Sequence, residues 1–323
     1  MSATLGHAAK ITLKTLPFIL LRMGLYLAFG FLFCLYWVLV YFIGQGAAAI
    51  HDYARVAVWI IALILPFPFV KLFREYFLYV LKTAHVAVIV QLALHGSLPE
   101  GRSQVEWGKE KVMARFKETS VLFVVDRLVN GVIGAINGMM QGMANLFQGV
   151  PGLQSLVGLA KLVLRFSLTY IDESVMARNF MKEDETVWQS AKTGLVLYAQ
   201  SWKQILKTAF FLGIAAILSY ALFLVLYLIP FLGLAGIYPK LKILWILFAF
   251  IFAAVTKLAL FDPWALTSMI LAYIEATRDM IPDRGWEDKI AGISKKFRQI
   301  QEKAATALPT TPAIPTSPVS PVS

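Results

Sequence analysis

The segment from Ser120 to Gln148 has the period of one long helix with two different faces. One face carries polar side chains that are almost all uncharged, and the opposite face carries only apolar ones. The polar face holds Asp126, Asn130, Asn137, Gln141, Asn145 and Gln148, and it is bordered by Gly131, Gly134, Gly138 and Gly142. A surface helix of a soluble protein carries Lys and Glu on its polar face, yet no residue from 128 to 160 is charged. The segment therefore predicts a membrane helix whose polar side faces other helices or a wet cavity.

Composition supports a membrane environment for the whole chain. Hydrophobic residues make up 59% of the 323 residues and charged residues only 15%, whereas about a quarter of a soluble domain is charged. The net charge of +11 could indicate nucleic acid or an anionic membrane surface as a partner. Because the Lys and Arg residues cluster beside apolar runs, we predict membrane lipids as partners and no nucleic acid.

The apolar runs predict an all-α, polytopic integral membrane helical bundle, with amphipathic cytoplasmic helices and a disordered Pro-rich C-terminal tail. About 20 apolar residues cross a bilayer, and several runs reach this length. The predicted segments are membrane helices over 1–96, a cytoplasmic loop over 97–119, Gly/Asn-striped membrane helices over 120–171, an amphipathic cytoplasmic segment over 172–207, membrane helices over 208–278, an amphipathic helix over 279–306 and the tail over 307–323.

The distribution of Lys and Arg predicts the orientation of these helices. Lys10 and Lys14 precede the first span, and the segments 97–119, 172–207 and 279–306 hold most of the other basic residues. The positive-inside rule then places both termini in the cytoplasm, with four to six crossings. We expect the plasma membrane, or the inner membrane of a bacterium.

The sequence carries no enzymatic or metal-binding motif that we could identify. The four histidines are not paired at metal-ligand spacing, Cys34 is the single cysteine, and no P-loop or nucleophile elbow occurs. We therefore predict no catalytic residue, no metal ligand and no cofactor, and a chain that is not an enzyme.

Two interpretations of the polar stripe remain open. Gly134, Gly138 and Gly142 repeat every four residues, which lets helices approach closely and would support a homo-oligomer. In that case the chain is a scaffold. Alternatively, the stripe walls a pathway for a polar solute or a lipid headgroup, and the chain is a transporter or lipid-handling protein. The pathway would be lined by Asp126, Asn130, Asn137, Gln141 and Asn145, with Asp126 as cation partner or proton carrier.

Basic residues inside apolar runs give further candidates. Lys71 and Lys257 would extend to the headgroups, or they would pair with Glu75 and Asp262 and mark a coupling site. They lie 186 residues apart, the offset that also separates Trp59 from Trp245, which suggests an internal repeat. Arg22, near the start of the first span, is expected to extend outward.

The C-terminal region offers two partner-binding patterns. Apolar residues at 286, 290, 293, 297 and 300 form a short heptad-like seam, typical of a helix on the membrane or on the protein, or of a short coiled coil. Pro309, Pro312, Pro315, Pro318 and Pro321 repeat every third residue. This period suits polyproline II, either as a spacer or as a ligand for a Pro-motif-binding protein.

One region resembles a known family. Ser190-Ala191-Lys192 opens an amphipathic helix, and Leu271-Ala272-Tyr273-Ile274-Glu275 ends an apolar run about 85 residues later. Residues 170–276 are thereby similar to the C-terminal half of choline transporter-like membrane proteins, which implies a multi-pass transporter fold. The sequence departs from the usual Glu-Asp at Glu275-Ala276, and it lacks the long N-terminal half and large external loop of that family. No functional residue is carried over.

Overall fold

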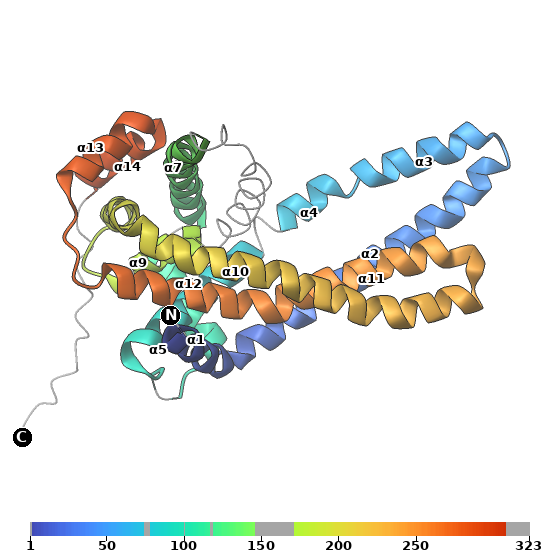
Figure 1. The fold of residues 1–323 in the computed structure, drawn as a ribbon, viewed down its shortest axis with the longest axis horizontal. Helices are drawn as coiled ribbons and strands as arrows, with labels where there is room; N and C mark the ends of the chain where they lie inside the picture. The colour runs from blue at the N-terminus through green and yellow to red at the C-terminus, as the bar shows by residue number, and fades with distance from the viewer. Residues whose placement is uncertain (1, 74–77, 100, 117–118, 146–170, 308–323) are drawn as a thin grey trace, which may run out of the picture.

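A computed structural model describes residues 2–73, 78–99, 101–116, 119–145 and 171–307 (Figure 1). Every regular element in those ranges is helical, which confirms the all-α prediction for them. The α-helices are α1 (Ser2–Lys14), α2 (Leu16–Ala48), α3 (Asp52–Ile64), α4 (Phe67–Phe73), α5 (Tyr79–His95), α6 (Gln104–Phe116), α7 (Thr119–Asn145), α9 (Ile171–Met181), α10 (Val187–Ile237), α11 (Lys242–Thr256), α12 (Asp262–Thr277), α13 (Arg284–Ile293) and α14 (Lys295–Thr306). A 3-10 turn, η3 (Pro239–Leu241), and a π-helical turn, η4 (Lys257–Phe261), complete them.

Two hairpins of long apolar helices extend from a helical body (Figure 1). In the first hairpin α2 runs away from the body and α3–α4 returns towards it, and in the second α10 runs out and α11 returns. Both turns, at 49–51 and at η3, therefore lie at the same far end, which we call the tip. Trp59 lies in one returning helix and Trp245 in the other, as the suggested repeat would require.

The hairpin helices have the length and polarity of membrane spans. Four stretches qualify: Leu16–Ala48, Tyr53–Phe73, Val187–Ile237 and Pro239–Thr277. A fifth would require α6 and the start of α7, bent by 80°, to act as one span. In the most apolar part of the four stretches only 6% to 33% of residues are buried inside the protein. Large side chains such as Phe31 and Leu222 are more than 60% exposed, which suits a lipid environment.

The outgoing helix of the second hairpin, α10, begins in the body and runs to the tip without a break. It begins with a capping box, in which the Thr186 hydroxyl accepts from the Gln189 backbone N–H and the Gln189 side chain accepts from Thr186. Its 51 residues correspond to a length of about 76 Å. The expected boundary between an amphipathic segment and a span near residue 207 thus falls inside one helix, and Pro230 does not end it.

The return path of the second hairpin is also nearly continuous. Pro263 does not break this region, because it lies in the first turn of α12, where a missing backbone N–H costs little. The π-helical turn η4 connects α11 to α12, and α12 then runs into the body. α12 is buried along almost its whole length, and the Tyr273 hydroxyl donates to the Gly194 carbonyl of α10 at 3.1 Å.

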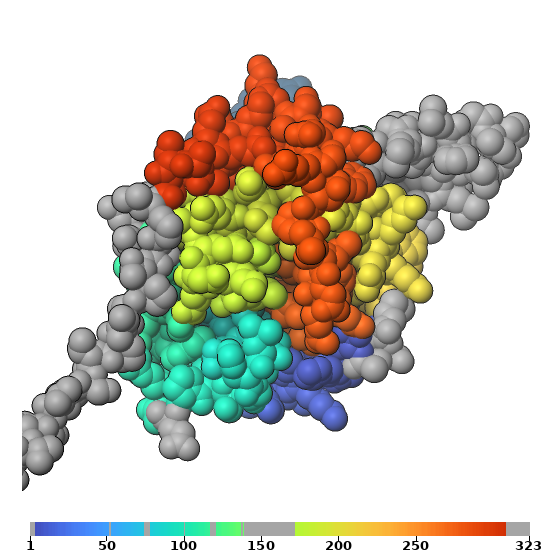
Figure 2. All heavy atoms as spheres, turned by 90° about the vertical axis from the view of Figure 1, so that its left-hand side faces the viewer, coloured from blue at the N-terminus to red at the C-terminus, as the bar shows by residue number. Residues whose placement is uncertain are grey.

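The C-terminal seam belongs to the body. Ser294 ends α13 and caps α14, so the expected single helix is two short ones. Ile290, Phe297 and Ile300 are at most 1% exposed and pack in the main core. Figure 2 shows α13–α14 on one side of the body, with α5 and α6 on the opposite side. A coiled coil is therefore not supported, because Ile290, Phe297 and Ile300 of the seam are already buried in the body. The Pro-rich tail lies outside the described residues.

Candidate functional site

A cluster of buried and partly buried charged side chains lies where the hairpins join the body. Lys82 of α5 forms an ion pair with Glu173 of α9, and their side chains are 26% and 6% exposed. Asp126 of α7, Asp172 of α9, Asp262 of α12 and Arg22 of α2 also lie close enough to Lys82 to interact electrostatically with it. Together with Lys257, the partner of Asp262, we call these residues the charge cluster: Arg22, Lys82, Asp126, Asp172, Glu173, Lys257 and Asp262.

The second ion pair depends on the π-helical turn. The Lys257 Nζ lies 2.6 Å from the Asp262 Oδ1, and both side chains are mostly buried. Residues five apart lie on different faces of a regular α-helix, whereas the wider turn of η4 brings them onto the same side. Of the two alternatives for Lys257, the structure therefore shows pairing with Asp262. Such π-turns are frequent at functional sites.

Arg22 does not extend outward as expected from the sequence. It is only 5% exposed and faces Lys82 and His85 from the first turns of α2. Its Nη1 has no partner among the described residues. The expectation was wrong because α6 packs on α2, and the His85 ring of α5 stacks on Phe18 one turn before Arg22, so the guanidinium is enclosed by the protein.

A histidine fixes the position of α5 beside Arg22. The His85 Nε2 and the Thr15 hydroxyl are 2.9 Å apart, and both side chains are fully buried. The His85 ring stacks on Phe18 at a centroid distance of 4.9 Å. The other ring nitrogen, Nδ1, is buried without a partner in the described part of the chain. The turn between α1 and α2 is therefore attached to the same helix that presents Lys82.

The start of the polar stripe contributes to the charge cluster. The Asn130 side chain donates to the Asp126 Oδ1 at 3.0 Å, and Tyr79 of α5 is a further hydrogen-bonding partner of Asp126. Asn137, Gln141 and Asn145 follow along α7, but their side chains lie outside the described residues, as do the surroundings of Gly142. Gly134 and Gly138 face open space, because a Cβ built at either position meets no described atom within 4 Å.

Four polar atoms of this region are buried without a hydrogen-bond partner among the described residues: Arg22 Nη1, His85 Nδ1, Asp172 Oδ1 and Glu173 Oε2. Most buried polar groups in proteins are satisfied, so unsatisfied ones suggest a water, an ion or a ligand. In this region the unsatisfied atoms include a donor, Arg22 Nη1, and two carboxylate acceptors, Asp172 Oδ1 and Glu173 Oε2. Among the residues that the structure describes, no three His, Cys, Asp or Glu side chains are arranged to hold a metal ion.

The charge cluster has more carboxylates than cations. Asp126, Asp172, Glu173 and Asp262 face one buried cation, Arg22, and two partly buried ones, Lys82 and Lys257, whereas the further cation beside Asp126, Arg127, is exposed. Burial raises the pKa of Asp172 from 3.8 to about 7, although Lys82 opposes the shift. Asp126 adds to the rise by repulsion. Asp172 can therefore gain or lose a proton near neutral pH.

This shift predicts a pH-dependent effect of Asp172→Asn. Between about pH 4 and 7 the folded state binds a proton that the unfolded state has released, so the free energy of unfolding falls as pH rises through this window. Asparagine cannot ionise, so the variant avoids the loss. We expect Asp172→Asn to raise the melting temperature of the detergent-solubilised protein at pH 8, and to raise it less at pH 5.

Asp184→Asn is the matched control, because Asp184 is exposed in the loop after α9. Its difference from the wild type should stay small and should not change between pH 5 and 8. A melting temperature below that of the wild type for Asp172→Asn at pH 8 would contradict the assignment. It would mean that ionised Asp172 stabilises the fold through Lys82.

The structure thus brings some of the sequence candidates together and not others. Asp126, Asn130 and Lys257 lie in or beside the charge cluster, whereas Lys71 lies in α4 of the first hairpin. Sequence reasoning missed Lys82, although it is the single Lys, Arg, Asp or Glu between residues 78 and 94. It also missed Asp172 and Glu173, which were assigned to a solvated segment.

Comparison of the chain with protein-family models, curated proteins and solved structures finds no match.

Proposed function

We propose that this chain is a multi-pass membrane transport protein for a cation, or for a polar solute that moves with a proton. The pathway includes the charge cluster and continues along the polar face of α7 over residues 126–148. The observation that carries the proposal is the excess of buried and partly buried carboxylates at the base of two membrane hairpins. Buried ionisable groups in membrane proteins are costly, and they commonly mark ion pathways and proton relays.

The composition of the charge cluster supports a site that changes its charge. Its members come from α2, α5, α7, α9, η4 and α12, so both hairpins and the body contribute. Movement of a hairpin relative to the body would therefore alter the distances from Lys82 to Arg22 and to Asp262. Asp172, with a pKa of about 7, is the group that would exchange a proton.

The basic residues support a location in the plasma membrane, with the body on the cytoplasmic side. In the described tip, the basic side chains are Arg55, Lys240 and Lys242, and most other Lys and Arg residues belong to the body or its loops. Under the positive-inside rule both termini are then cytoplasmic. The resemblance of residues 170–276 to choline transporter-like proteins is in keeping with a transporter.

A scaffold function is the second candidate, and one observation favours it. Gly134 and Gly138 have open space where a Cβ would lie, so the ridge is not used by the described helices. A second copy of the chain could pack there. Asn137→Leu should then leave function intact and Gly138→Leu should abolish it, whereas both changes should damage a transporter.

Water accessibility along α7 tests the pathway directly. We would place single cysteines at 130, 137, 141 and 145 in a Cys34→Ala background, and treat native membranes with a small charged thiol reagent. Labelling at all four positions is the expected result, because a pathway for a polar solute contains water. Val132→Cys and Ile136→Cys are the matched controls, since both side chains are completely buried in the core.

Protection of all four polar positions, equal to that of the two controls, would contradict the pathway. It would indicate a dry helix contact and favour the scaffold. Labelling at 130 alone would also contradict it, because Asn130 is exposed in the structure and needs no pathway to react. The informative positions are therefore 137, 141 and 145.

A further inference from the structure

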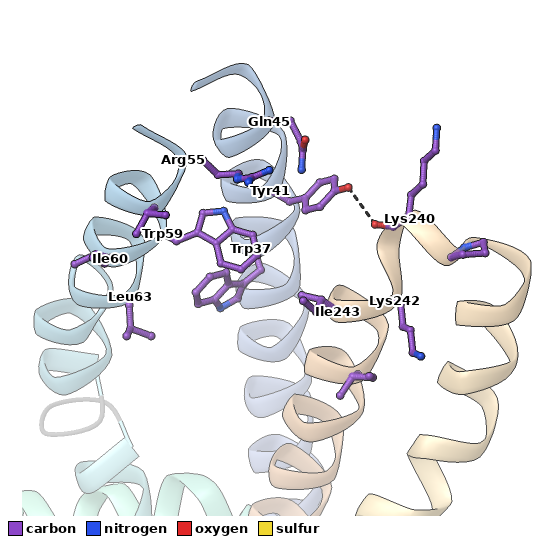
Figure 3. A pocket seen from close by; sticks show the side chains of 13 residues that line it. Trp37, Tyr41, Gln45, Arg55, Trp59, Ile60, Leu63, Lys240, Lys242 and Ile243 are labelled. Carbon is purple, nitrogen blue, oxygen red and sulfur yellow. Dashed lines mark hydrogen bonds between the residues drawn. The ribbon is translucent and has the colours of Figure 1, made fainter. Parts of the chain in front are cut away.

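A cavity of about 750 Å³ lies at the tip, between α2, α3 and the start of α11 (Figure 3). Trp37, Tyr41 and Trp59 form its inner wall. The Tyr41 hydroxyl donates to the Lys240 carbonyl at 3.1 Å and so connects the two hairpins across the cavity. This site is separate from the charge cluster, which lies at the opposite end of the hairpins.

The mouth of the cavity is cationic. Figure 3 shows Arg55 and Gln45 reaching towards one another above Trp59, and Lys240 rising from the opposite wall. Lys242 belongs to the same wall, but its amine points away from the cavity. No Asp or Glu is among the residues that line it. The mouth therefore favours an anion.

Below the mouth the cavity continues as an apolar groove. Two further cavities, of about 380 and 960 Å³, share Trp37 and Leu63 with the first. They extend along α3 and α4 to Lys71, and their walls between these ends are almost wholly apolar. The 16 residues from Arg55 to Lys71 span roughly 24 Å of helix, which approaches the hydrocarbon thickness of a bilayer, about 30 Å.

Two unsatisfied donors also lie along this groove. The indole N–H groups of Trp37 and Trp59 are buried and have no acceptor among the described residues. A buried indole N–H usually has a partner. Both nitrogen atoms are closed to solvent, so the two rings contribute apolar surface to the groove, and the hydrogen-bonding groups at its mouth come from Gln45 and the basic side chains.

We propose that this groove binds an anionic phospholipid. Its phosphate lies between Arg55, Gln45 and Lys240, and an acyl chain lies along α3 and α4. α3 packs extensively only on α2 among the described helices, and residues such as Phe67 and Phe69 are about 70% exposed. The first hairpin is therefore open to lipid from the side.

The charge pattern favours a lipid over a second copy of the chain. Two copies in one membrane have the same orientation, so a contact through this groove would bring the cationic mouths of both chains to the same level. Like charges would then repel at the tip. An anionic amphiphile instead matches both ends of the groove, with charge at the mouth and hydrocarbon along the walls.

The test is lipid-dependent thermal stabilisation of the full chain in detergent, titrated with phosphatidylglycerol or with zwitterionic phosphatidylcholine. Phosphatidylglycerol should raise the melting temperature of the wild type, and phosphatidylcholine should raise it less. With about a fivefold loss of affinity per cation, Arg55→Gln should weaken the effect roughly fivefold and Arg55→Gln/Lys240→Gln roughly thirtyfold.

Lys242→Gln is the matched control, because it removes the same charge from the same tip but from a side chain that points away. Its apparent affinity should change less than twofold. Equal effects of the two lipids would overturn the proposal, and so would equal losses for Lys242→Gln and Arg55→Gln. If Arg55→Gln does not fold, Lys240→Gln alone gives the same comparison.

Two further measurements distinguish other occupants. Glycerol phosphate carries the headgroup chemistry without acyl chains, and stabilisation by it equal to that by phosphatidylglycerol would indicate a site for a free phosphate. Light scattering of the wild type and of Arg55→Gln reports the mass in detergent. A dimer that this substitution alters would indicate that a second copy occupies the groove. Either result would replace the lipid assignment.

Discussion

Replacing Lys82 with methionine is expected to destabilise the protein by about 3–5 kcal/mol, because it leaves buried carboxylates without their cation. Lys82 pairs directly with Glu173, whose side chain is 6% exposed, and it faces Asp172 and Asp126 as well. Methionine preserves most of the volume of the lysine stem, so the loss is mainly electrostatic. The melting temperature of the detergent-solubilised protein should fall by roughly 10 °C.

Lys111→Met is the matched control for this experiment. Lys111 also forms an ion pair with a glutamate, Glu183, at 2.7 Å, but these side chains are 34% and 58% exposed. Solvent screening limits such a pair to about 1 kcal/mol or less. If Lys82→Met and Lys111→Met lower the melting temperature equally, the charge cluster is not buried as the structure shows.

Lys82→Met should also be partly rescued by Asp172→Asn. Without Lys82, nothing in the cluster lowers the pKa of Asp172 as strongly, and the carboxylate becomes more costly to ionise. The double variant should therefore regain part of the lost melting temperature at pH 8. Additive losses would mean that Lys82 acts through Glu173 alone.

The sequence predicts the helices of this protein better than their ends. Apolar runs and the lack of charge predict the helical class and the regions that form long apolar helices, because membrane spans depend on local composition. The continuity of α10 was not predictable in this way. Its first half packs against α9, α12 and α14. These contacts join residues far apart in the sequence, so local composition does not show that the amphipathic half and the apolar half form one helix.

The charge cluster shows where sequence reasoning reaches its limit. Asp126 was identifiable because it is the one acidic residue on an uncharged polar face. Its cluster partners were not, because Lys82, Asp172 and Arg22 are separated from it by 44, 46 and 104 positions, and no local pattern joins them. The pairing of Lys257 with Asp262 was predictable as an alternative, but its cause, a π-helical turn, was not.

Glycine residues near the polar stripe illustrate the same limit on a smaller scale. The spacing of Gly131, Gly134 and Gly138 suggests one continuous ridge, yet their surroundings differ. A Cβ at Gly131 would clash with the Lys296 side chain of α14, whereas a Cβ at Gly134 or Gly138 meets no described atom within 4 Å. The helix therefore uses part of its glycine border to admit α14, while no other described helix packs on the rest.

Phe297 provides the apolar anchor of α14, and Phe297→Ala should destabilise the protein by about 3–5 kcal/mol. Its ring is completely buried in the core, where α14 packs on α7 and α10. Alanine leaves a cavity between three helices, which rigid helix backbones can close only in part. The melting temperature in detergent should fall by roughly 10 °C, and cleavage of α14 by trypsin should become faster.

Ile293→Ala is the matched control, because Ile293 is the last residue of α13 and 44% exposed. A substitution of that kind usually changes stability by about 0.5 kcal/mol or less. If Phe297→Ala accelerates tryptic cleavage of α14 without lowering the melting temperature, α14 opens as a separate unit. In that case the body keeps its stability when the C-terminal helices detach, and detachment of α14 exposes Gly131.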